Sequence, residues 1–111
     1  MADIAARGER DPQYLYVCVS RPVENPPEIA LSSEQVHEQH VAFLQDLFDR
    51  GLLFGSGPQQ DEAGERYGGA VVILQNVTTA EARDIAAKEP NVREGLRNME
   101  VFPWRRVWFG G

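Results

Sequence analysis

The hydrophobic and polar positions of the chain follow two periods, which predict strands and helices in turn. Four short stretches rich in β-branched and aromatic residues are typical of strands. They cover residues 14–20, 52–57, 67–76 and 99–109. Two further stretches carry apolar residues every three or four positions, which predicts amphipathic helices. The first helix is predicted to begin at Ser32 and end at Gly51, and the second to cover residues 80–88.

Local signals mark the beginnings of both predicted helices. Ser32 with Gln35, and Thr78 with Glu81, have the form of capping boxes, in which side chains satisfy free N–H groups of the first turn. The apolar stripe of the first helix consists of Val36, Val41, Phe43, Leu44, Leu47 and Phe48. The inner face of the second helix consists of Ala82, Ile85 and Ala86.

The predicted elements follow the order β-α-β-β-α-β. In a chain of 111 residues, this order is typical of the ferredoxin-like α+β sandwich. That fold has a four-stranded antiparallel sheet with both helices on one face. Another two-layer α+β sandwich built from the same elements is the alternative.

The predicted strands are apolar on both faces. A sheet that carries helices on one side usually alternates apolar with polar positions. Here both sets of alternating positions are apolar, and six of the ten aromatic residues fall in the first and last strands. The second face would expose a patch that soluble monomers rarely tolerate. We therefore predict a homodimer that packs sheet against sheet, with scattered surface aromatics as the alternative.

Composition and charge narrow the classes of partner. A mass of 12.4 kDa fits one domain, which we place at residues 14–109 after a flexible N-terminal arm at 1–13. A net charge of −6 disfavours nucleic acid and anionic membrane surfaces. No apolar run approaches the roughly 20 residues of a membrane span. The single cysteine, Cys18, excludes an intramolecular disulfide and is compatible with a cytoplasmic location.

Two histidines, His37 and His40, lie on the first predicted helix, and His40 falls within its apolar stripe. One interpretation is a core or interface histidine that bonds a backbone carbonyl. The other is a general acid–base, because imidazole ordinarily titrates near pH 6.5. The two rings could also share a metal with a carboxylate, but no cluster of further histidines or cysteines is available, so no metal is predicted.

Glu89 is the second candidate, because it follows the second helix and precedes Pro90. The helices lie side by side in the predicted fold, so the end of the second can approach the first. A carboxylate there could orient an imidazole by accepting its second N–H. A solvated carboxylate at a charged helix end is the alternative.

Further residues are candidates for substrate binding. Glycines in the stretch LFGSGPQQ lack the spacing of a phosphate-binding loop, and we interpret them as a bulge that opens space near His40. Near the C-terminus, a tryptophan and two arginines could line a pocket for an aromatic or acidic ligand, or simply pack against the strand. The predicted substrate-binding residues are His37, Ser56, Gly57, Pro58, Trp104 and Arg106. If the ligand is acidic, Arg105 or Arg106 would supply the positive charge.

Three motifs resemble those of the YCII-related (YciI-like) family. They are HVAFLQDLFDRGLLFGSGP at 40–58, AAKEPNVREGL at 86–96 and EVFPWRRV at 100–107. The resemblance covers about residues 14–109. It implies a dimeric α/β-barrel type of the ferredoxin-like superfamily with a histidine–aspartate pair in a cleft. The histidine corresponds to His40 and the acidic residue to Glu89, which departs from the usual aspartate.

The resemblance also implies a kind of chemistry. A member of this family acts as a dehydrochlorinase in aromatic compound degradation, and relatives on the same fold include isomerases and cofactor-free monooxygenases. We therefore expect a small cofactor-independent enzyme, a lyase or isomerase, in which His40 and Glu89 move a proton on a small ring substrate. A non-catalytic domain that binds a small metabolite and a purely structural dimerisation module are the alternatives.

Overall fold

The computed structural model describes residues 11–108 and 110. Most of the predicted N-terminal arm and the last position of the predicted final strand lie outside the described residues. The strands are β1 (Tyr14–Pro22), β2 (Leu53–Gln60), β3 (Arg66–Leu74) and β4 (Arg97–Arg105). The helices are α1 (Ser33–Asp49), α2 (Thr79–Lys88) and the short α3 (Pro90–Arg93). Both predicted capping boxes are present.

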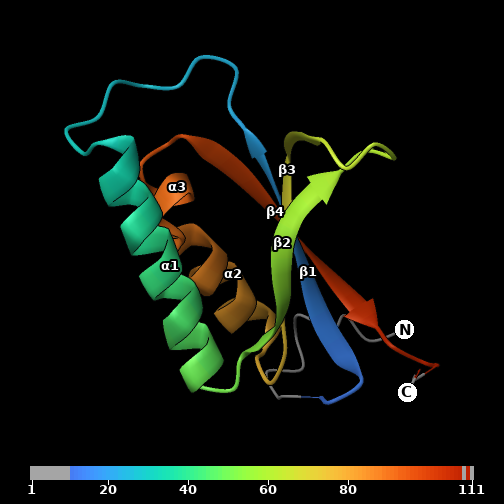
Figure 1. The fold of residues 1–111 in the computed structure, drawn as a ribbon. Coiled ribbons are helices and arrows are strands. Elements are labelled where there is room, and N and C mark those ends of the chain that lie inside the picture. Colours follow the sequence, from blue (N-terminus) through green and yellow to red (C-terminus); the bar gives the residue numbers. More distant parts are fainter. Residues whose placement is uncertain (1–10, 109, 111) are drawn as a thin grey trace.

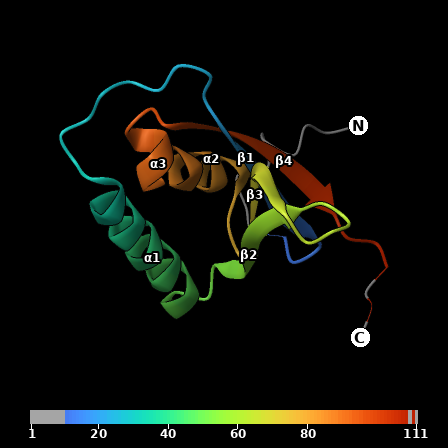
Figure 2. The same cartoon turned by 45° about the horizontal axis from the view of Figure 1, so that its top comes forward.

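The four strands form one antiparallel sheet in the order β2-β3-β1-β4. All three helices lie on the same face of this sheet, and β1 runs through its centre (Figures 1 and 2). The arrangement is the predicted ferredoxin-like α+β sandwich. On this face, α1 and α3 contact each other. Residues about 50 positions apart in the sequence therefore meet.

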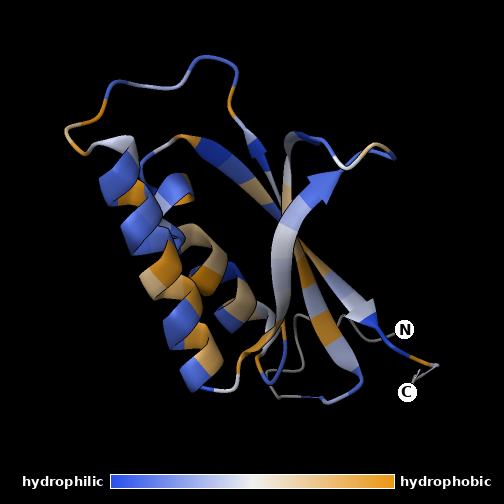
Figure 3. Ribbon diagram, in the orientation of Figure 1, coloured by the Kyte–Doolittle hydropathy of each residue, from blue (hydrophilic) through white to orange (hydrophobic). Residues whose placement is uncertain are grey.

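The core lies between the sheet on one side and the second half of α1 together with α2 on the other. Its buried members are Tyr16, Cys18, Leu47, Val72, Leu74, Val77 and Ala82. The first half of α1 is largely hydrophilic, whereas its second half carries most of the apolar residues (Figure 3). Most of the apolar packing of α1 is therefore at one end of the helix–sheet interface, with Val36 the buried apolar residue of its first half. The other end has the space for a cavity.

Two predicted strand boundaries were wrong. We expected Pro58 to end the second strand, but β2 continues to Gln60 and Pro58 stands opposite Ala70. Because β2 is an edge strand, a residue without a backbone N–H can be accommodated there. The final strand was predicted over 99–109, but β4 covers Arg97–Arg105 and Val107 is exposed beyond its end.

The apolar stripe of α1 is narrower than predicted. Val36 and Leu47 are buried and Phe43 and Leu44 pack against the core. Val41 and Phe48 were assigned to the same stripe, but their side chains are half or more exposed. The sheet covers only part of the helix, so residues at the edges of a broad stripe remain in solvent.

The buried position of Leu47 leads to a stability prediction. Leu47→Ala should lower the free energy of unfolding by about 2–5 kcal/mol, because the Leu47 side chain is fully buried and its removal leaves a cavity in the core. Phe48→Ala is the matched control on the next residue, and its cost should stay near 0.5 kcal/mol. Urea-induced unfolding measures both values. Equal losses for the two variants would contradict the assignment of the core.

Candidate active site

Glu89 occupies the sharp turn between α2 and α3. The residue before a proline is disfavoured in helical conformation, and Glu89 has φ −57° and ψ 129° before Pro90. The same proline is well suited to the first position of a new helix. Glu89 thus ends α2 and caps α3, and its carboxylate accepts the backbone N–H of Val92 at 3.0 Å.

The Glu89 carboxylate also receives a hydrogen bond from α1. Its Oε1 lies 2.7 Å from His40 Nδ1 and 3.0 Å from the Asn91 side-chain amide. Glu89 is only 2% exposed, whereas the His40 side chain is 29% exposed. Neither alternative interpretation describes this arrangement, because His40 bonds a side chain and Glu89 is not solvated.

The electrostatic environment keeps Glu89 ionised. Burial by itself would raise the pKa of the Glu89 carboxyl. The hydrogen bonds from His40, Asn91 and the Val92 N–H oppose burial and hold this pKa below its ordinary value. An ionised carboxylate only accepts hydrogen bonds, so His40 Nδ1 must carry a proton. In the neutral imidazole, the lone pair then resides on Nε2.

A cavity of about 620 Å³ lies between the first half of α1 and the sheet. Six of the residues predicted to form the site line it, and they come from α1, β2 and the α2–α3 turn. These six are His37, His40, Ser56, Gly57, Pro58 and Glu89. The cavity wall therefore brings the His40–Glu89 pair together with the glycine-containing strand, while their predicted roles in catalysis and binding stay predictions.

The pairing of β2 is irregular around the glycines for which a bulge was predicted. The pairing with β3 shifts between Leu53 and Gly55, and again between Pro58 and Gln60. A Cβ atom at Gly55 or Gly57 would meet no atom within 4 Å, so neither glycine is required by a close contact. Their absent side chains instead leave this part of β2 open.

Trp104 and Arg106 lie away from the cavity. Trp104 is near the end of β4, opposite Leu15, and is 46% exposed. Arg106 follows β4, donates its backbone N–H to Gln13 and places its guanidinium 5.7 Å from the Phe54 ring centroid. The cavity lining instead contains Arg66 and Arg97, which our sequence analysis did not select. Trp104 and Arg106 are not among the residues that line this cavity, so their role in substrate binding stays a prediction.

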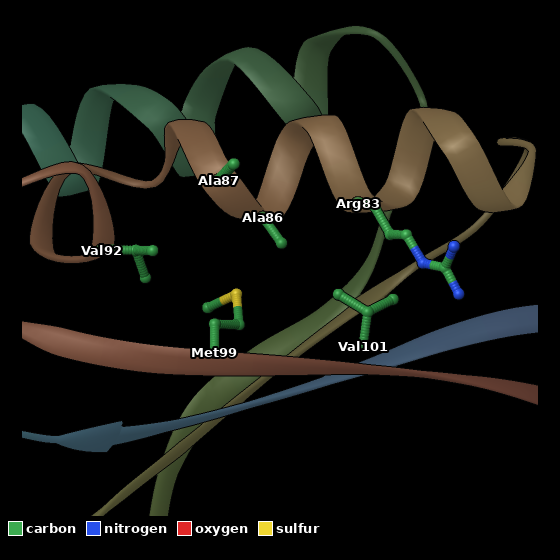
Figure 4. A pocket seen from close by; sticks show the side chains of 6 residues that line it. All are labelled: Arg83, Ala86, Ala87, Val92, Met99 and Val101. Atoms are coloured by element: carbon green, nitrogen blue, oxygen red, sulfur yellow. The ribbon is translucent and has the colours of Figure 1, made fainter.

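A second cavity of about 360 Å³ lies between α2 and β4. Alanines on α2 and apolar side chains from α3 and β4 form most of its wall, while Arg83 reaches along its edge (Figure 4). Met99 belongs to the linings of both cavities.

Other reactive groups are not placed for chemistry. Cys18 lies in the core, and burial raises the pKa of its thiol to about 11. It is therefore a thiol rather than a nucleophilic thiolate at neutral pH. Within the described residues, no three His, Cys, Asp or Glu side chains are arranged to hold a metal ion. None of the helices in the described part of the chain combines the length and apolar character that a membrane span requires.

The fold and the site together define a class of protein: a small ferredoxin-like domain with a histidine–carboxylate pair in a cavity wall. The YCII-related domain model matches residues 14–105. The chain belongs to the YCII-related family, as its motifs indicated. None of the curated proteins matches it significantly.

A solved structure has a similar fold. It is 5-chloro-2-hydroxyhydroquinone dehydrochlorinase from Burkholderia phenoliruptrix AC1100, in complex with 2,5-dihydroxybenzoquinone. The TM-score is 0.58 at 18% sequence identity, and the match covers 87% of this chain and 95% of that one. At this identity, the likeness establishes the fold.

Proposed function

We propose that this protein is a small cofactor-independent enzyme, a lyase or isomerase, that transfers a proton on a small ring substrate. The hydrogen bond between His40 and Glu89 at the wall of the large cavity is the observation that carries this proposal. A general base must reach the substrate and have its other nitrogen fixed by a partner. His40 lines the cavity and has Nδ1 held by Glu89, and both features support this role in the domain that we place at residues 14–109.

The proposed reaction begins with a C–H bond next to a carbonyl group. His40 Nε2 takes this proton, and the C–H electron pair forms an enolate or a new double bond. In a dehydrochlorination, the same electron pair expels chloride from the neighbouring carbon. In an isomerisation, His40 returns the proton at another carbon. Glu89 stabilises the imidazolium that forms between these steps.

The similar structure supports an aromatic-derived substrate. That protein is a dehydrochlorinase of a chlorinated hydroxyhydroquinone, and its ligand is a hydroxylated quinone. A cavity of about 620 Å³ is within the usual range for a small-molecule site. We accordingly propose a role in aromatic compound degradation, and we place it in the cytoplasm because the only cysteine is a buried free thiol.

The direct experiment is a substrate screen with the wild-type protein. Chlorinated hydroxyhydroquinones and lactones of similar size are incubated with the protein, and chloride release and ultraviolet spectra are recorded. Catalytic consumption of a compound would support the enzyme. Saturable binding without consumption of any compound would favour the metabolite-binding alternative.

We also propose that the protein forms a homodimer through the free face of the sheet. This face carries Phe102 and Trp104, each about half exposed, beside the partly exposed Val17. The helices cover the opposite face (Figure 1). Two such sheets could bury their aromatic residues against each other, as in aligned sheet packing.

Light scattering after size-exclusion chromatography tests the dimer. We expect a mass twice the 12.4 kDa of the chain. Trp104→Glu should shift the protein to the monomer mass, because a charge would be buried without a partner. Phe48→Glu, which alters an exposed aromatic on α1, should remain dimeric. A wild-type mass of about 12 kDa at micromolar concentration would refute the dimer.

A further inference from the structure

Arg97 is anchored in the wall of the large cavity by uncharged groups. Its Nε donates to the Ser20 hydroxyl, and its Nη2 donates to the carbonyls of Ser20, at 3.1 Å, and Gly68. Ser20 is itself 3% exposed. No carboxylate within the described residues pairs with this guanidinium. The positive charge of Arg97 is therefore fixed in position but not neutralised.

The anchoring leaves one side of the guanidinium available. A guanidinium has five N–H donors, and the three on Nε and Nη2 are engaged. The two on Nη1 donate to no acceptor in the part of the chain that the structure describes, and Nη1 is not among its buried unpaired atoms. Since Arg97 lines the cavity, these two donors are available to a ligand there.

The charges of the cavity lining differ from those of the chain. The whole protein carries a net charge of −6, yet the lining contains two arginines and a single carboxylate. That carboxylate, on Glu89, is already engaged by His40, Asn91 and the Val92 N–H. The histidines aside, the two guanidiniums and the one carboxylate give the cavity wall one net positive charge. A protein that is acidic elsewhere thus offers a local site for an anion.

We propose that Arg97 is a substrate-binding residue that holds an oxyanion of the substrate through Nη1, and that the substrate class is therefore a small planar anion. This inference rests on the proposed function, because it concerns the substrate of the same cavity. The oxyanion is either a carboxylate or an ionised ring hydroxyl, because both accept charge-assisted hydrogen bonds from a guanidinium N–H. Arg97 would then bind the oxyanion of the same substrate ring from which His40 Nε2 takes the proton.

Two matched pairs of probes test the proposal by isothermal titration calorimetry. The first pair is 2,5-dihydroxybenzoquinone, whose ring hydroxyls ionise, and its neutral dimethyl ether. The second pair is benzoate and benzamide. Arg97→Gln should weaken binding of at least one anion by about 10–100-fold, as expected for a lost charge-assisted hydrogen bond. Binding of the neutral partner should change by less than about threefold. The affected pair identifies the source of the oxyanion.

Two further variants separate binding from folding. Arg21→Gln removes the same charge from an exposed position on β1 outside the cavity, and it should bind both anions normally. Arg97→Lys keeps the positive charge but lacks the several N–H donors of the planar guanidinium. It should bind the anion with intermediate affinity. If Arg97→Gln does not fold, the Arg97→Lys comparison decides. Equal losses for charged and neutral probes, or no binding of either anion to wild-type protein at millimolar concentration, would overturn the proposal.

The outcome is distinguishable from failure of the proposed enzyme. Binding at equilibrium requires no turnover. Arg97-dependent binding without catalysis would therefore contradict the proposed enzymatic activity and support the anion site. Turnover that depends on His40 but has the same KM in Arg97→Gln would contradict the anion site and support the proposed enzymatic activity.

Discussion

Replacing His40 with asparagine should reduce turnover of the substrate by about 10²–10⁴-fold while the fold remains intact. An asparagine amide can place an N–H near the position of Nδ1 and retain the hydrogen bond to Glu89. It has no atom equivalent to Nε2, so it lacks the base. His40→Ala removes both functions and leaves a buried carboxylate with fewer donors, so it should be equally inactive and less stable.

Steady-state kinetics and circular dichroism of the two variants measure this prediction. Glu38→Gln, at an exposed position on the same helix, is the control and should retain wild-type kcat and KM. His37 lines the cavity, but it is His40 that bonds Glu89, so His37→Asn should raise KM more than it lowers kcat. A His40→Asn variant with an unchanged kcat would exclude His40 as the base.

The periodicity of the sequence determined most of the fold, because each element carries a strong local signal. The capping boxes at Ser32 and Thr78 predicted helices that begin within one residue of their observed positions. The boundaries of β2 and β4 were harder to predict, because they depend on pairing between strands. Whether Pro58 can lie within a strand depends on its place at the sheet edge, which local sequence does not reveal.

The two parts of the candidate site differ in how far the sequence revealed them. Glu89 precedes a proline, so its local geometry could be expected, and the family motif associated it with His40. Arg97 has no such local signal. It reaches the cavity because β4 pairs with β1 in a register that sets Arg97 opposite Pro22 and Met99 opposite Ser20. Trp104 and Arg106 were selected because an aromatic and a basic side chain suit an aromatic or acidic ligand. The same register places the end of β4 outside the cavity that His40 lines.

Replacing Glu89 with glutamine should lower kcat by roughly 10²-fold or more, because a neutral amide neither fixes the proton on Nδ1 nor stabilises an imidazolium. The amide group of glutamine can also turn its NH₂ toward His40 and leave Nδ1 without an acceptor. Kinetics of Glu89→Gln beside His40→Asn would show whether the two residues act as a unit. Losses that fail to add in the double variant are the expected result.

The same substitution should change how stability depends on pH. The folded-state pKa of Glu89 is lowered, so the unfolded chain binds its proton at higher pH than the folded protein does. The carboxylate therefore contributes its full stabilisation above the ordinary carboxyl pKa of about 4.3, and this contribution is lost as pH falls through the folded-state value. Glu89→Gln should be less stable than wild type by about 1–3 kcal/mol at neutral pH. In urea unfolding between pH 7 and pH 3, this difference should shrink only on the acid side. A difference that stays constant across the range would show that the ionised carboxylate does not stabilise the fold.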